Sequence, residues 1–110
     1  MFESTRQYYL YDEPTDMRKS FHTLGAIVTA QMGLSLRSGS GFVFINRRKT
    51  HLKMLLWEGD GFSLYFKRLE QGTFEHIEQL KNYELSYEKL LLVLRGIETA
   101  KIIKRKRFSL

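Results

Sequence analysis

The sequence contains no cysteine, so disulfide bonds, thiolate chemistry and cysteine-ligated zinc are all excluded. It has no long apolar run either. The longest, near Leu52–Trp57 and Leu90–Leu94, are far shorter than the ~20 residues that span a membrane. The N-terminal segment Met1–Arg6 lacks the basic start and apolar stretch of a secretory signal. We therefore expect a soluble, cytoplasmic protein that has no membrane partner.

Residue patterns that support catalysis are also scarce. The histidines, His22, His51 and His76, do not have a metal-ligand spacing such as His-x-x-x-His. Glu58 and Asp60 lie in a glycine-rich turn, where such carboxylates are ordinary turn chemistry. The chain has no nucleophile motif of the Gly-x-Ser-x-Gly type and no phosphate-binding glycine loop. The sequence therefore predicts no enzymatic activity, no cofactor and no metal site.

What the chain does have is an excess of positive charge, +6 in total, arranged in zones. Residues 41–69 are basic, residues 70–100 are acidic, and residues 101–107 carry five positive charges without an acid. Basic zones of this kind favour polyanions, and nucleic acid is the commonest polyanion in a cytoplasm. The alternative is a charged surface that serves only solubility, ending in a fraying tail.

The pattern of apolar residues predicts a single α+β domain over residues 1–100, followed by a basic C-terminal tail over residues 101–110. No internal repeat and no linker-like segment divides the chain. The predicted order of elements is strand, helix, three strands and helix. This order corresponds to a small antiparallel β-sheet, a meander, packed by an N-terminal helix and followed by a C-terminal helix.

The N-terminal helix is predicted from the helical spacing of apolar residues over Met17–Met32. A short aromatic strand at Tyr8–Tyr11 precedes it, and Pro14 disfavours helix at the residue before it. Thr15 or Asp16 would then cap the helix by accepting an unpaired backbone N–H.

The C-terminal helix is predicted over Tyr87–Arg95, with Ser86 as its cap and Gly96 at its end. The preceding segment, Glu75–Tyr83, is compatible with either a loop or an irregular helix.

Three strands are predicted between the helices, at Phe42–Ile45, Leu52–Glu58 and Phe62–Arg68. The first is apolar on both faces, as expected for a central strand. A polar turn with a basic tip, Asn46–Thr50, joins the first two strands, and Gly59–Gly61 is a strong hairpin signal between the last two.

If Gly59–Gly61 are all loop residues, the pairing of residues across the last hairpin is determined. Lys53 then lies directly opposite Lys67, and these like charges would either attract an anion or splay into water. The other face of the hairpin is apolar. The residues expected to be buried are Leu24, Ile27, Val28, Phe44, Leu56, Leu64 and Phe66.

Basic residues gather near predicted turns and aromatic side chains, a combination that suits phosphate contact and base stacking. Trp57 and Tyr65 would either stack on bases or simply cover the second face of the sheet. The candidate nucleic-acid-binding residues are Arg18, Lys19, Arg47, Arg48, Lys49, Lys53, Lys67 and Arg68.

Two blocks of sequence are more specific than these patterns. The first is Pro14–Phe21, and the second consists of Phe42–Lys53, Trp57–Phe62 and Leu64–Phe74. In this order and spacing they resemble the TnpB-type accessory proteins of insertion-sequence-sixty-six elements. The resemblance covers roughly Tyr8–Phe74, with a weaker likeness at Leu85–Gly96.

The resemblance implies a short protein encoded beside a transposase and a second small accessory protein. It implies a role in transposition with no established enzymatic activity, and it supplies no catalytic residues. After Phe74 the chain departs from the family, because Glu75–Glu78 stands where many relatives have a proline-containing segment. The basic tail is also outside the resemblance.

Two functions are therefore expected as alternatives. The first is a DNA-binding accessory subunit that helps to assemble a transposition complex on element ends, through the basic zones at 47–53, 67–68 and 101–107. The second is a protein adaptor that bridges the transposase and the other accessory protein without contacting DNA, as the acidic 70–100 segment and the apolar last helix would favour. A catalytic protein is a distant third alternative. Salt-dependent DNA binding separates the first two.

Overall fold

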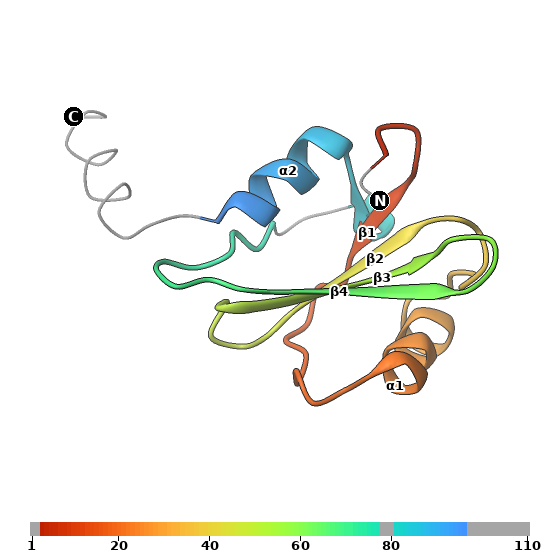
Figure 1. Ribbon diagram of the computed structural model, residues 1–110, viewed down its shortest axis with the longest axis horizontal. Coiled ribbons are helices and arrows are strands. Elements are labelled where there is room, and N and C mark those ends of the chain that lie inside the picture. The colour runs from red at the N-terminus through yellow and green to blue at the C-terminus, as the bar shows by residue number, and fades with distance from the viewer. Residues whose placement is uncertain (1–2, 78–80, 97–110) are drawn as a thin grey trace.

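The computed structural model describes residues 3–77 and 81–96, and places a five-stranded β-sheet between two helices (Figure 1). The strands are β1 (Tyr8–Leu10), β2 (Gly41–Ile45), β3 (His51–Trp57), β4 (Phe62–Arg68) and β5 (Glu84–Leu85). The helical elements are α1 (Phe21–Ala26), the π-helical turn η1 (Ile27–Gln31), the 3-10 turn η2 (Lys81–Tyr83) and α2 (Tyr87–Arg95). Within these described residues, no helix is long and apolar enough to cross a membrane.

The sheet is mixed rather than purely antiparallel. Its strand order is β4-β3-β2-β1-β5, and β1 and β2 pair in parallel. The chain travels through α1 and η1 between these two strands, and such a crossover can return it to the same end of the sheet. β2, β3 and β4 form the predicted antiparallel meander. The prediction of an antiparallel sheet was therefore right for the meander and wrong for the β1–β2 junction.

Two hydrophobic cores cover the opposite faces of the sheet, which we call the α1 side and the α2 side. Successive side chains of a strand point to opposite faces, so Val43 and Ile45 meet α2 whereas Phe42 and Phe44 meet α1. The α2-side core consists of Tyr8, Leu10, Val43, Ile45, Leu52, Met54, Leu56, Phe74, Leu85, Leu90, Val93 and Leu94. The α1-side core consists of Tyr11, Leu24, Val28, Met32, Phe42, Phe44 and Leu55. β2 is buried along its whole length, as predicted for a central strand.

The N-terminal helix is shorter than the predicted span of Met17–Met32. Helical structure begins at Phe21 and continues through η1. Leu24 and Val28 are fully buried, as predicted, while Ile27 is only half-buried.

Local hydrogen bonds explain why the helix begins late. Thr15 is buried, and its backbone N–H donates to the carbonyl of Ile45 at 2.9 Å. The carboxylate of Asp16 accepts the backbone N–H of Arg18 at 2.8 Å. Bonds of this kind compete with the helix for the same groups. The prediction that Thr15 or Asp16 caps the helix was therefore wrong, and the residue before the helix is Ser20.

The C-terminal helix agrees with the prediction. α2 begins after Ser86, whose hydroxyl accepts the backbone N–H of Lys89 at 3.2 Å. It ends before Gly96, which has a φ of 75° that a residue with a side chain rarely adopts. Of the ambiguous segment Glu75–Tyr83, the described parts are irregular up to residue 77 and a 3-10 turn at Lys81–Tyr83. The expected basic tail over residues 101–110 lies outside the described residues.

Replacing the cap, Ser86→Ala, is expected to lower the free energy of unfolding by about 1 kcal/mol, because one backbone N–H of the first turn loses its partner. For a domain of this size, that corresponds to a fall in Tm of roughly 4–8 °C. Thermal unfolding followed by circular dichroism measures it. Ser35→Ala, at an exposed loop position, is the control, and equal melting of both variants would contradict the capping role.

The β3–β4 hairpin differs from the predicted one by a single residue. Glu58 donates its N–H to the carbonyl of Gly61 at 2.8 Å, so the loop proper contains only Gly59 and Asp60. Gly59 has a φ of 91°, as a two-residue hairpin with glycine at its first loop position requires. Gly59–Gly61 all lie outside the strands, but the predicted register, with Lys53 opposite Lys67, was wrong, because Lys53 pairs with Phe66.

This difference moves every β4 side chain to the other face of the sheet. Leu64 pairs with Leu55 instead of Leu56, and lies on the α1 side. On that side Leu64 is 38% exposed and Phe66 is 53% exposed. The prediction that these two residues are buried was wrong. Phe44 and Leu56 are fully buried, as predicted.

Candidate nucleic-acid interface

The turn between β2 and β3 is organised by the side chain of Asn46. Its Oδ1 accepts the backbone N–H groups of Thr50 at 2.9 Å and His51 at 3.0 Å, and its Nδ2 donates to the Thr50 hydroxyl at 3.1 Å. Lys49 adopts a left-handed φ of 61°, and its carbonyl accepts the backbone N–H of Phe74 at 2.6 Å. Hydrogen bonds from the Asn46 side chain and from the backbone of Phe74 therefore fix the conformation of this turn.

The side chains at the tip of the turn are basic and exposed. They are Arg47, Arg48 and Lys49, and neither salt bridge found among residues 3–77 and 81–96 involves them. Three neighbouring cations on a fixed backbone repel one another, and a bound anion would relieve that repulsion.

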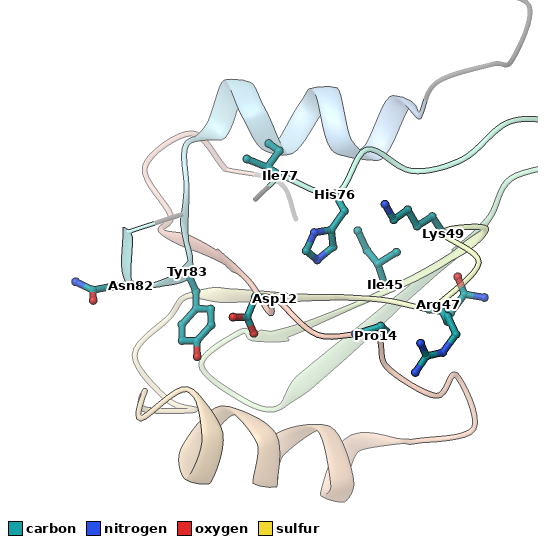
Figure 2. A pocket seen from close by; sticks show the side chains of 10 residues that line it. Asp12, Pro14, Ile45, Arg47, Lys49, His76, Ile77, Asn82 and Tyr83 are labelled. Carbon is teal, nitrogen blue, oxygen red and sulfur yellow. The ribbon is translucent and has the colours of Figure 1, made fainter. Parts of the chain in front are cut away.

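Two hollows flank this turn and share Arg47. Figure 2 shows the first, a cavity of about 700 Å³ into which the β2–β3 turn contributes Arg47 and Lys49. His76 lies on the same rim, while Asp12 and Tyr83 line the far side. The mixture of charges makes this hollow less selective for an anion than the second one.

The second hollow, of about 560 Å³, is lined by Lys19, Arg47, Arg48 and His51, with Asp16 as its acidic member. Three predicted site residues, from segments far apart in the sequence, therefore meet around one cavity. The fold brings them together because the chain before α1 runs past the end of the meander.

Arg18 is engaged by Asp16. The Asp16 carboxylate accepts hydrogen bonds from the Arg18 guanidinium at 2.6 and 3.0 Å, and from its backbone N–H. These bonds lower the pKa of Asp16 to about 2 and raise the pKa of Arg18. The pair is exposed, so it contributes little to stability and a phosphate can compete for Arg18.

Lys53 and Lys67 do not lie side by side. The Lys53 ammonium donates to the carbonyl of Lys19 at 2.7 Å on the α1 side. The Lys67 ammonium donates to the carbonyl of Leu94 at 2.8 Å, at the C-terminal end of α2, where the helix dipole favours a cation. The predicted juxtaposition was wrong because the register places these residues on opposite faces. Lys67 therefore lies apart from the other predicted residues.

Two residues of this surface were missed by the sequence analysis, His51 and Phe66. Their rings stack with centroids 5.8 Å apart, and the Lys53 ammonium lies 5.6 Å from the Phe66 ring. Arg68 is opposite His51 in the sheet and exposed. Phe66 was missed because the expected register buried it. The sequence signal for His51 was its position in the basic zone at 47–53, and not a metal-ligand spacing.

The aromatic residues considered for stacking are placed differently. Tyr65 packs against the α2-side core, and Trp57 lies at the opposite end of the hairpin, where the Arg37 guanidinium is 5.4 Å from its ring. Phe66 is thus the aromatic residue that lies among the basic side chains. Within the described residues, no group of three His, Cys, Asp or Glu side chains is placed to hold a metal ion.

These features define a small α+β domain with a basic surface around a rigid turn. Residues 6–104 match the family described as IS66 Orf2 like protein, and the chain belongs to that family. The match confirms the resemblance found in the sequence and extends it through α2. No solved structure matches the chain.

Two relatives come from Sinorhizobium fredii (strain NBRC 101917 / NGR234). The uncharacterized protein y4hO is 38% identical over 60 residues, which make up 54% of this chain and 52% of that protein. The uncharacterized protein y4jC is 30% identical over 96 residues, or 86% of this chain and 80% of that protein. The chain therefore spans about half the length of y4hO and most of y4jC.

Proposed function

We propose that the protein is a non-catalytic accessory factor of insertion-sequence transposition that binds DNA around the β2–β3 turn. Membership of the IS66 Orf2-like family supports the transposition role. The observation that carries DNA binding is the convergence of Lys19, Arg47 and Arg48 on one hollow beside a fixed turn. We name the basic turn surface by its residues, Lys19, Arg47, Arg48, Lys49, His51, Lys53, Phe66 and Arg68.

The chemistry of this surface fits a phosphate backbone. A guanidinium can donate two parallel hydrogen bonds to one phosphate, and Arg47 and Arg48 offer two such groups next to each other. Because Asn46 already holds the turn, little conformational entropy would be lost when DNA docks. Each phosphate contact would also release condensed counterions. The exposed ring of Phe66 is available to stack on an unpaired base.

Replacing Arg47, Arg48 and Lys49 by alanine is expected to weaken binding to all DNA sequences by at least roughly tenfold. The slope of log affinity against log salt concentration should flatten by about three units, about one for each lost contact. Fluorescence anisotropy of a labelled duplex over a series of salt concentrations measures both. The free energy of unfolding should change by less than ~0.5 kcal/mol, since the three side chains are exposed.

The matched control removes the same amount of charge from exposed positions elsewhere, Lys81, Lys89 and Arg95. Alanine at these three positions should leave the salt slope unchanged. If both triple variants lost affinity equally, net charge rather than the β2–β3 turn would govern DNA binding, and the proposal would fail.

The second candidate is the adaptor that bridges the transposase and a second small accessory protein. The exposed apolar side chains of β4, Leu64 and Phe66, favour it, because exposed apolar surface commonly marks a protein interface. On this alternative the triple variant at 47–49 binds DNA as well as the parent does, or neither binds. A pull-down with the transposase, with and without terminal DNA, then separates the two functions.

A further inference from the structure

β4 is an outer strand of the sheet, and its backbone hydrogen-bonding pattern can be worked out. The N–H of Glu58 donates to Gly61, and the N–H of Leu69 donates to Thr50, at the two ends of the hairpin. Bonded and non-bonded positions alternate in an antiparallel pair, so the odd-numbered residues of β4 bond to β3. The backbone groups that point away from the sheet belong to Phe62, Leu64, Phe66 and Arg68.

The same even-numbered residues have their side chains on the α1 side, where Leu64 and Phe66 are exposed. The backbone groups that no strand of the described residues pairs with, and the exposed apolar side chains, therefore belong to one set of residues. An outer strand of seven residues with exposed apolar side chains is a template for pairing with another strand.

We propose that β4 pairs with β4 of a second copy of this chain, antiparallel and centred on Leu64. In this register Leu64 of one copy faces Leu64 of the other. Phe66 of each copy faces Phe62 of the other, and Arg68 stands opposite Asp60 in the loop of the other copy. Apolar residues then meet apolar residues, and each end of the ladder has an opposite-charge pair. Asp60 and Arg68 are both exposed in one copy.

Registers of the β4–β4 pair that are centred on other residues bring less complementary side chains together. Centring the pair on Tyr65 would set Phe62 opposite Arg68, and centring it on Phe66 would set Leu64 opposite Arg68. Each of these leaves the arginine without an acid and an apolar side chain against a charge. Charge complementarity therefore selects the Leu64 centre, and selects a second copy as the occupant of this edge.

The two-fold axis of such a pair runs perpendicular to the sheet, so the α1 sides of both copies lie on the same side. The two basic turn surfaces would then face one way. Their Arg68 residues would lie roughly 26 Å apart along the strand direction, the span of about eight extended residues. The dimer itself does not rest on DNA binding.

Single cysteine variants test the register, because the native chain has no cysteine. In Leu64→Cys the two Cα atoms would be about 5.5 Å apart, inside the ~4.4–6.8 Å range of disulfides. In Phe66→Cys they would be more than ~13 Å apart, too far to bridge. Mild oxidation without DNA is expected to give a covalent dimer for Leu64→Cys and none for Phe66→Cys. Cross-linking at residue 66 instead of residue 64 would overturn the proposal.

Analytical ultracentrifugation without DNA tests the association itself. The parent should sediment as a dimer, and Leu64→Lys should raise the dimer dissociation constant by roughly tenfold or more. Leu92→Lys, at a 52% exposed position on α2, is the control and should stay dimeric. Asp60→Arg and Arg68→Asp should each weaken the dimer, and combining them should restore it.

A parent that stays monomeric at every concentration would overturn the proposal, as would a dimer that survives Leu64→Lys. A monomeric parent that captures the transposase through β4 would support the adaptor function and overturn self-pairing. Because these measurements contain no DNA, their failure is distinguishable from a failure of the 47–49 variant to lose DNA binding.

Discussion

Phe44→Ala should bring the protein close to unfolding at room temperature. Phe44 is fully buried in β2, the middle strand of the sheet, and the centroid of its ring lies 6.0 Å from that of Tyr11. Removing it loses the burial of the ring and leaves a cavity, which together cost about 3–5 kcal/mol. The total stability of a domain this size is roughly 5–15 kcal/mol. Urea unfolding should therefore show a much lower midpoint with an unchanged slope.

Phe66→Ala is the matched control, because it removes the same atoms from a side chain that is 53% exposed. In dilute solution it should cost less than ~1 kcal/mol. Equal destabilisation by the two substitutions would mean that Phe66 is buried, and would contradict the register of the β3–β4 hairpin.

Gly41→Ala should also destabilise the fold strongly, by about 1–3 kcal/mol. A Cβ atom at residue 41 would lie 2.7 Å from Cδ1 of Tyr8 and 2.9 Å from Cδ2 of Leu56. Both neighbours are fully buried in the α2-side core, so neither can move into solvent. The parallel β1–β2 pair would have to separate to make room. Differential scanning calorimetry should show a Tm lower by at least ~4 °C.

Gly61→Ala is the control for this substitution. Nothing lies within 4 Å of a Cβ atom built at residue 61, so the same added methyl group meets open space. Its Tm should stay close to that of the parent. If the Gly41→Ala and Gly61→Ala variants had the same Tm, β1 would not pack against residue 41 as closely as described.

Elements whose signals are local could be predicted from the sequence. The helix α2 was found with both ends, because Ser86 and Gly96 form its cap and its stop with their own chemistry. The meander followed from a strand that is apolar on both faces and from turn residues at each end. The exposed cations of the 47–49 turn could be predicted for the same reason.

Features that depend on a distant partner could not be predicted. β5 has only two residues, and its pairing with β1 joins opposite ends of the described chain. The hairpin loop contained two glycines, Gly59 and Gly61, and the choice of one left-handed position decided which face each β4 side chain takes. Lys19 and Arg47 line one hollow because the chain before α1 runs past the end of the meander. The exposure of Phe66 follows from the register of the β3–β4 hairpin.

The late position of β5 in the sequence has a consequence for assembly during synthesis. Until Glu84–Leu85 has left the ribosome, the described part of the growing sheet has two outer strands, the three-residue β1 and the seven-residue β4, and each can accept another strand. A sheet with two open edges can add copies without limit, as a filament does. β5 covers β1 and is itself too short to act as a template, so the sheet formed by the described residues keeps one long open edge, β4. A unit with one such edge can only form a closed pair, and the two-residue strand thereby separates a finite assembly from an unlimited one.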